Sequence, residues 1–183
     1  MRSGGDKTPL FLIHPVGGTV FWYMKLVKHL KTNRPVYGIQ DPGIVHKNLI
    51  FSSIEELAEF YLQWIRKVQP HGPYMIGGAS FGATVSVEVA RKIQELGEKV
   101  CFIPILDGWA IYPNKLLNDS YFKDTMNRQH EQLRAQFAAK NIENMESIFD
   151  LQWQRLTLLW KYKMLPVEHK IILFKSEELL PAF

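Results

Sequence analysis

The chain has 183 residues, of which 46% are hydrophobic and 22% charged, so it is long enough for one domain with a full core and too short for two. Its apolar runs are far shorter than the roughly 20 residues that cross a bilayer, and residues 1–6 lack a secretory signal, which predicts a cytoplasmic protein without membrane contacts. The net charge of +4 is spread along the chain and does not predict a nucleic-acid surface. The single cysteine, Cys101, excludes an internal disulfide and predicts no zinc site; its apolar neighbours predict a buried thiol.

Short apolar runs alternate with helical patterns along the first two thirds of the chain. The segment Ser53-Ile54-Glu55-Glu56 has capping-box spacing, and the helix that it starts is predicted to stop at Pro70. A later helical stripe ends at Gly97. Strands separated by helices predict a mostly parallel sheet with helices on both faces in an α/β fold. The expected strands are 9–13, 35–39, 74–76, 100–106 and 170–174, and the expected helices are 19–30 (capped by Thr19), 54–68 and the one that follows Ser80.

A different pattern follows Asp107, because no strand-like run appears before Lys170. Apolar residues recur near helical spacing between Ile148 and Trp160, and a structureless loop of this length is rare in a compact domain. We therefore expect a helical insertion over the strand ends. The single domain then divides into a leader or linker (1–8), a core (9–110), a helical lid (111–165), and the last visible core strand with the chain end (166–183).

The strongest functional signal is Gly78-Ala79-Ser80-Phe81-Gly82, a G-x-S-x-G motif between a predicted strand and a predicted helix. In that setting a serine is held on a strained turn with its hydroxyl exposed, which predicts Ser80 as a nucleophile. The glycines are required because Cβ atoms there would collide where the strand turns into the helix. The amide of Phe81, at the helix N-terminus, is predicted to donate to a developing oxyanion.

An oxyanion hole needs a second backbone donor, and the loop His14-Pro15-Val16-Gly17-Gly18 after the first strand can supply it. Its glycines allow the backbone to approach a substrate. We predict the Val16 amide as the donor, with Gly17 as the alternative. His14 is expected to hold this loop by hydrogen bonds rather than to act as a general base.

A serine nucleophile needs a histidine to accept its proton and a carboxylate to orient that histidine. Asp107 directly follows the strand 100–106, at the edge of a parallel sheet where ligands bind. It also stands after Ser80 in the order serine, acid, histidine. We therefore predict Asp107 as the triad acid, with a helix cap or turn as the structural alternative.

Several segments together make the chain resemble the thioesterase domains of fatty acid, polyketide and nonribosomal peptide synthases, in the α/β-hydrolase superfamily. They are PLFLIHPVGG, SIEELAEFYLQWIRKVQPHGPY, MIGGASFGATVSVEVARKIQELGEKV and ILDGWAIYP. The resemblance implies release of an acyl, polyketide or peptidyl chain from the phosphopantetheine arm of a carrier protein, by hydrolysis or cyclisation through an acyl-serine intermediate. It also implies a carrier domain in the same parent polypeptide, no metal or organic cofactor of its own, and a lid whose Phe137, Ile148 and Leu151 face an acyl channel.

The catalytic histidine of that family would lie well beyond the strand 170–174, and no histidine follows His169. We therefore expect a C-terminally incomplete copy of the fold that is nearly inactive by itself. A stand-alone editing thioesterase and a carboxylesterase remain alternatives. A noncatalytic acyl-binding or carrier-binding module is the alternative of another class.

Overall fold

A parallel sheet forms the centre of the computed structural model, which describes residues 1–108, 124, 127–128, 131–132, 135 and 143–177. The strands are β1 (Leu10–Ile13), β2 (Val36–Ile39), β3 (Tyr74–Ala79), β4 (Val100–Leu106) and β5 (Ile171–Phe174), and they lie side by side in the order β2-β1-β3-β4-β5. Every neighbouring pair is parallel. The helical elements are α1 (Tyr23–His29), the short 3-10 helix η1 (Pro42–Ile44), α2 (Ile54–Val68), α3 (Phe81–Glu95) and α6 (Glu143–Lys161).

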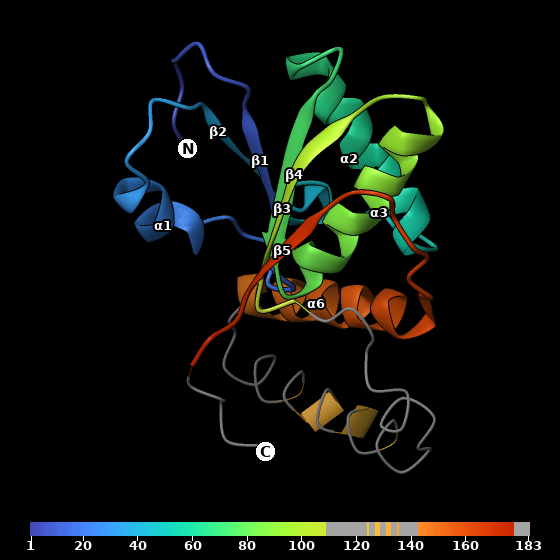
Figure 1. Ribbon diagram of the computed structural model, residues 1–183. Coiled ribbons are helices and arrows are strands. Elements are labelled where there is room, and N and C mark those ends of the chain that lie inside the picture. The colour runs from blue at the N-terminus through green and yellow to red at the C-terminus, as the bar shows by residue number, and fades with distance from the viewer. Residues whose placement is uncertain (109–123, 125–126, 129–130, 133–134, 136–142, 178–183) are drawn as a thin grey trace.

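Helices cover both faces of this sheet, as predicted. Helix α1 lies on one face, while α2 and α3 lie on the other (Figure 1). Alternate residues of β1 supply the two cores: Leu10 and Leu12 pack with α1, whereas Phe11 and Ile13 join the larger cluster under α2 and α3. Because both faces of β1 are buried, its sequence is a continuous apolar run rather than an alternating one. The predicted α/β class is confirmed.

Two helix starts show how capping shapes the fold. Helix α2 begins as predicted, because the Ser53 hydroxyl accepts a hydrogen bond from the Glu56 amide at 3.1 Å. The prediction of a Thr19 cap was wrong, since α1 begins at Tyr23 and its cap, Trp22, makes no side-chain cap bond. The chain before α1 instead forms a turn closed by the Tyr23 amide and the Val20 carbonyl at 3.1 Å.

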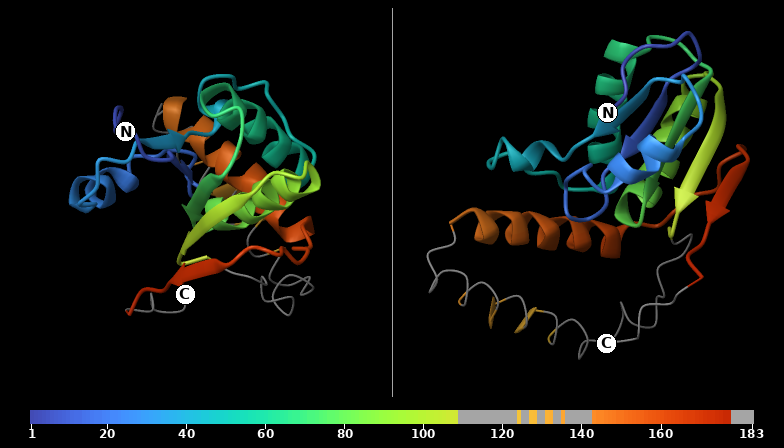
Figure 2. Two further views of the ribbon diagram at one scale, coloured as in Figure 1. Left: turned by 45° about the horizontal axis from the view of Figure 1, so that its top comes forward. Right: turned by 90° about the vertical axis from the view of Figure 1, so that its left-hand side faces the viewer.

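Helix α6 lies across the carboxyl ends of the strands, at the edge of the sheet where the loops emerge (Figure 2). It belongs to the range predicted as a helical lid, although much of the remainder of that range falls outside the described residues. Its side chains Leu158 and Leu159 are buried in the larger core cluster. The C-terminal half of α6 is therefore part of the packed core.

Three local features differ from simple expectation. Cys101 is exposed rather than buried, and the β3–β4 register shifts at Tyr74/Met75, facing the start of β4. A register irregularity changes which face a side chain points to, so the apolar run did not reveal this exposure. At the other edge, Arg2 within the expected leader pairs with Val36 of β2 in an antiparallel bridge. Among the described residues, no helix has both the length and the apolarity to span a membrane.

Candidate active site

The segments singled out in the sequence meet at one edge of the sheet. The last residue of β1, Ile13, is in register with Gly78 of β3, and Ala79 of β3 is in register with Leu106 of β4. The Ser80 amide also donates to the Leu106 carbonyl at 3.1 Å. The loop after β1, the turn after β3 and the residue after β4 are consequently neighbours, which is the arrangement that the parallel topology predicts.

The turn at Ser80 has strained backbone geometry. Its φ of 51° and ψ of −117° lie in a region that residues with a side chain seldom occupy, and the residue is exposed. A Cβ atom on Gly78 would lie 2.5 Å from the Gly82 backbone, and one on Gly82 would lie 2.3 Å from the Ile13 carbonyl oxygen. The predicted reason for both glycines is therefore confirmed: the turn leaves no room for a side chain at either position.

A tyrosine from α1 holds the strand that leads into this turn. The Tyr23 hydroxyl donates to the Ile13 carbonyl at 2.6 Å and accepts from the Ala79 amide at 2.8 Å. Burial raises the pKa of Tyr23, so the hydroxyl keeps its proton and can serve as donor and acceptor at once. One side chain thus ties the ends of β1 and β3 together directly before Ser80.

One of the two predicted oxyanion donors, the Val16 amide, lies in the loop after β1, and the other, the Phe81 amide, lies at the start of the helix after β3. Helix α3 begins at Phe81, so this amide is among the first of the helix, which have no acceptor within it. Val16 lies in the loop after β1, where the Gly18 amide closes a turn onto the Pro15 carbonyl at 2.9 Å. Gly18 has a φ of +78°, a conformation that favours glycine.

Asp107 follows β4 with a φ of +45° and is exposed. Its amide donates to the Phe174 carbonyl at 2.9 Å, and its Oδ1 accepts a hydrogen bond from the Ser176 amide at 2.7 Å. The chain at the end of β5 therefore fixes the orientation of this carboxylate.

His14 is completely buried and makes the loop-holding hydrogen bonds expected of it. Nδ1 lies 2.7 Å from the Pro15 carbonyl, which can only accept, so Nδ1 carries the proton. Nε2 of the neutral ring then accepts from the Tyr61 hydroxyl at 2.6 Å. Burial lowers the pKa of His14, against the opposing effects of Asp41 and the Pro15 carbonyl. Both ring nitrogens are thus engaged away from Ser80.

A buried ion pair beside His14 was not predicted from the sequence. Arg155 of α6 donates through Nε and Nη2 to the carboxylate of Asp41, at 2.6 and 2.9 Å, and both side chains are inaccessible to solvent. Burial raises the pKa of Asp41, but the hydrogen bonds and the charge of Arg155, together with the hydrogen bond from the Gly43 amide, outweigh it and hold the pKa below its usual value. The signal available was a lone arginine four residues from Leu151 and Leu159, within the apolar stripe of a helix.

The remaining predicted residues lie in α6 or outside the described residues. Leu151 is buried, and its Cδ1 would lie 2.6 Å from a Cβ on Gly43 of η1. Ile148 is half-buried, and Phe137 is outside the described residues. In the described part of the chain, no histidine makes a hydrogen bond to Ser80 or Asp107; His29 and His71, for example, contact the Lys25 carbonyl and the Glu98 carboxylate.

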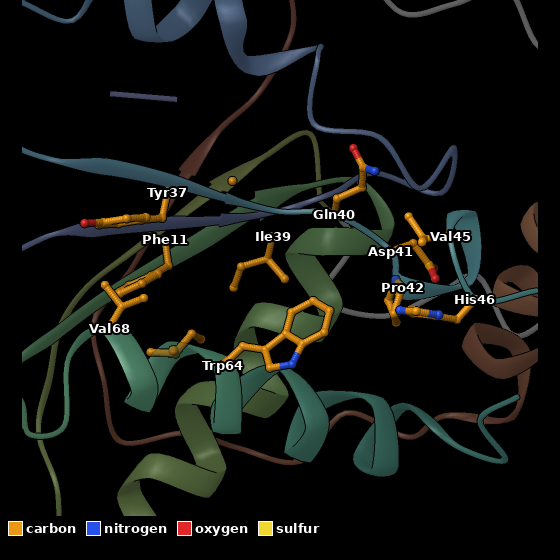
Figure 3. A pocket seen from close by; sticks show the side chains of 12 residues that line it. Phe11, Tyr37, Ile39, Gln40, Asp41, Pro42, Val45, His46, Trp64 and Val68 are labelled. Carbon is orange, nitrogen blue, oxygen red and sulfur yellow. The ribbon is translucent and has the colours of Figure 1, made fainter. Parts of the chain in front are cut away.

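A separate cavity of about 350 Å³ lies between β2 and α2 (Figure 3). Its walls are mainly apolar and aromatic, and Asp41 stands at one end of it. None of the predicted catalytic or oxyanion residues lines this cavity. Within the described residues, no group of three or more His, Cys, Asp and Glu side chains is arranged to hold a metal ion.

A parallel sheet, a strained serine turn between a strand and a helix, and an acid after the next strand define the class of α/β serine hydrolases. Within that class the chain belongs to the thioesterase domain family, which it matches over residues 8–168.

Relatives and solved structures agree with this assignment. The chain is 38% identical over 117 residues to the dimodular nonribosomal peptide synthase of Bacillus subtilis, covering 64% of this chain and 5% of that protein. It superimposes on holo-AB3403, a four-domain nonribosomal peptide synthetase bound to AMP and glycine, with a TM-score of 0.77 and 26% identity over 97% of this chain and 16% of that one. The NocB thioesterase domain, solved in covalent complex with a fluorophosphonate nocardicin G analog, shares the fold with a TM-score of 0.74 and 22% identity, over 92% of this chain and 72% of that one.

Proposed function

We propose that the chain releases an acyl or peptidyl group from the phosphopantetheine thioester of a carrier protein, with Ser80 as the nucleophile. The observation that carries this proposal is the exposed, strained turn at Ser80 between β3 and α3. Ser80 Oγ would attack the thioester carbonyl while the Val16 and Phe81 amides donate to the oxyanion. Collapse of the tetrahedral adduct breaks the carbon–sulfur bond, so that the thiol leaves and an acyl-Ser80 ester remains. Water or a nucleophile on the substrate then releases the product.

The general base in this proposal comes from outside the described residues, with Asp107 as its orienting acid. His14, the histidine closest to the proposed oxyanion loop in sequence, is buried, and its ring nitrogens contact Pro15 and Tyr61. A Ser80 hydroxyl without a base keeps its proton near neutral pH. We therefore infer that Ser80 reacts slowly unless a base from outside the described residues reaches it.

The carrier protein is the partner that the relatives support. The chain spans only 5% of the Bacillus subtilis synthase and 16% of AB3403, which are large multidomain synthetases. Because peptide synthetases present their intermediates on carrier domains, we propose that a carrier in the same polypeptide delivers the substrate. The chain would then need no cofactor of its own, since the phosphopantetheine arrives with the carrier.

A fluorophosphonate probe tests the nucleophile, because such a compound forms the covalent complex described for the NocB thioesterase domain. Labelling is measured on the 183-residue chain and on a version extended by the residues, if any, that the gene encodes beyond Phe183. Labelling of Ser80 in either form supports the proposal, and its absence in both favours a noncatalytic module. Faster labelling of the extended form supports a base outside these residues. Equal, Ser80-dependent rates would show that one of the six histidines present is the base.

A further inference from the structure

Arg155 is a buried charge for which the proposed reaction has no direct use. It projects from α6 and forms a two-point hydrogen bond with Asp41, the residue that precedes η1. Its guanidinium carbon also lies 5.2 Å from the centre of the Phe51 ring, a cation–π arrangement. Burying two charges costs desolvation energy that the pair seldom recovers fully, so such a pair is weak grounds for stability alone. The pair therefore calls for another explanation.

Asp41 contacts the proposed oxyanion loop through its backbone and its side chain. Its amide donates to the Gly18 carbonyl at 2.8 Å, which fixes the end of the loop 15–18. Its Oδ2 lies 3.4 Å from Nε2 of His14, at the beginning of the same loop. The space around Gly18 is also limited by the Asp41 side chain, whose Cβ would lie 3.2 Å from a Cβ on that glycine. A shift of Asp41 would therefore displace the loop at both ends.

Helix α6 also lies close to the loop. The Gln152 amide nitrogen lies 3.6 Å from the point where a side chain on Gly17 would begin, and Leu151 packs against Gly43 in η1. Arg155 lies one helical turn after these two residues, on the same face of α6, and donates to Asp41 from there. The helix, η1 and the loop thus form one packed unit above the strand ends.

We propose that Arg155 is a positioning residue that, through Asp41, holds the loop 15–18 so that the Val16 amide points into the oxyanion hole. This inference rests on the proposed function of Val16. An oxyanion donor works only when its hydrogen lies within hydrogen-bond reach of the developing charge, so a loop that moves by a fraction of an ångström loses catalytic effect without loss of fold. Docking of α6 and assembly of the oxyanion hole are then a single event.

Arg155→Lys tests the proposal, because it keeps the buried charge but cannot make the two-point contact. The matched control is Arg91→Lys: Arg91 also makes a two-point contact with a buried carboxylate, Glu88, but on α3, away from the loop. For each variant, the fluorophosphonate reaction with Ser80 is resolved into a maximal rate and a half-saturating probe concentration. The Val16 and Gly17 amides are followed by NMR chemical shift and hydrogen exchange.

We expect Arg155→Lys to lower the maximal rate about tenfold, less than the 10²–10³ seen when an oxyanion donor is removed, with the half-saturating concentration within about threefold. The Val16 and Gly17 signals should shift and exchange faster, whereas Arg91→Lys should change neither the rate nor these signals. Unchanged loop signals and rate in Arg155→Lys would reduce the ion pair to a structural contact and overturn the proposal.

A second variant covers the case in which Arg155→Lys does not fold. The double variant Asp41→Asn with Arg155→Gln removes both charges together. In the unmodified protein, Asp41 Oδ1 accepts a hydrogen bond from the Gly43 amide at 2.8 Å, and the asparagine keeps an oxygen that can accept the same bond. The same loop signals should move in this double variant, and unchanged signals would again overturn the proposal. The NMR readout needs no reaction at Ser80. Altered loop signals in a protein that is never labelled would therefore mean that the proposed function fails while the link from α6 to the loop stands.

Discussion

At the scale of single residues, the backbone of Ser80 matters as much as its hydroxyl. A φ of 51° in a residue with a side chain costs roughly 1–3 kcal/mol, which the neighbouring contacts must offset. The Tyr23 hydroxyl, which bridges Ile13 and Ala79, contributes to this offset, and the glycines at 78 and 82 leave room for the close contacts of the turn. The strain presents the hydroxyl at the sheet edge, beside the first amides of a helix.

Ser80→Ala should abolish fluorophosphonate labelling and thioester turnover while the fold is retained. The shape of the turn comes from its glycines and from Tyr23, none of which the substitution changes. The measurement is labelling followed by mass spectrometry, with thermal unfolding as the control for folding. Labelling or carrier-bound turnover that survives in a folded Ser80→Ala protein would show that another residue is the nucleophile.

In a protein that contains the general base, Asp107→Asn should lower Ser80-dependent turnover of an acyl thioester by several orders of magnitude, on the order of the 10⁴-fold loss for a triad aspartate in a serine protease. Asparagine keeps an oxygen that can accept from the Ser176 amide, so the fold should persist. Asp6→Asn, at an exposed carboxylate near the N-terminus, is the matched control. If activity stays within about threefold of the unmodified protein, a different carboxylate orients the base.

The sequence allowed a prediction for those candidate site residues whose pattern lies within a few neighbouring positions. Ser80 and its glycines form a local motif, and Asp107 directly follows an apolar strand. No such local signal marks Asp41, because its partner lies 114 residues away and no local pattern joins them. A buried salt bridge between distant elements depends on tertiary packing, which periodicity does not describe.

At the scale of elements, α6 is attached to the core at two places. Near its middle Arg155 holds Asp41, and just beyond its end the Tyr162 hydroxyl donates to Glu88 of α3 at 2.7 Å. Burial raises the pKa of Tyr162, so this donor keeps its proton. The sequence predicted helical structure here, but not that the second half of the helix would pack as part of the core.

Leu159→Ala should lower the free energy of unfolding by about 2–5 kcal/mol, because it leaves a cavity beneath α6. Leu159 is 5% exposed and belongs to the larger core cluster. The matched control is Leu165→Ala, because Leu165 is 54% exposed and its truncation should change the free energy by no more than about 0.5 kcal/mol. Urea unfolding gives both values. Equal small losses for the two variants would show that α6 is not part of the cooperative core.

At the scale of the whole molecule, four buried polar groups form a network at one end of the sheet. These groups are His14 in the loop after β1, Tyr61 of α2, Asp41 before η1, and Arg155 of α6, and they are connected by short contacts. These four groups join the sheet, the helical layer and α6 in one network. Its charge state therefore affects the stability of the entire protein rather than that of one element.

The stability of the protein should fall as the solution becomes acidic. Burial lowers the pKa of His14 below its ordinary 6.5, so between 6.5 and the folded-state pKa the unfolded chain binds a proton that the folded chain does not. Stability is therefore unaffected by this group above about pH 6.5 and declines below it, by at most about 1.4 kcal/mol per pH unit. Asp41, whose pKa lies below its usual 3.8, extends the decline at lower pH, where the unfolded chain again binds the extra proton.

Urea unfolding between pH 7.5 and 5 tests this dependence on unmodified protein, His14→Gln and His71→Gln. We expect His14→Gln to be less stable at pH 7.5, since it disturbs the contacts to Tyr61 and Pro15, but to lose less further stability as the pH falls. His71 lies on the surface, with 80% of its side chain exposed, so His71→Gln should keep the slope of the unmodified protein. The difference in slope between the two variants isolates His14 from the many surface groups that also titrate. The same slope in both would mean that His14 binds its proton equally well in the folded and unfolded chains, and that the network of Tyr61, Asp41 and Arg155 accommodates a charged imidazole.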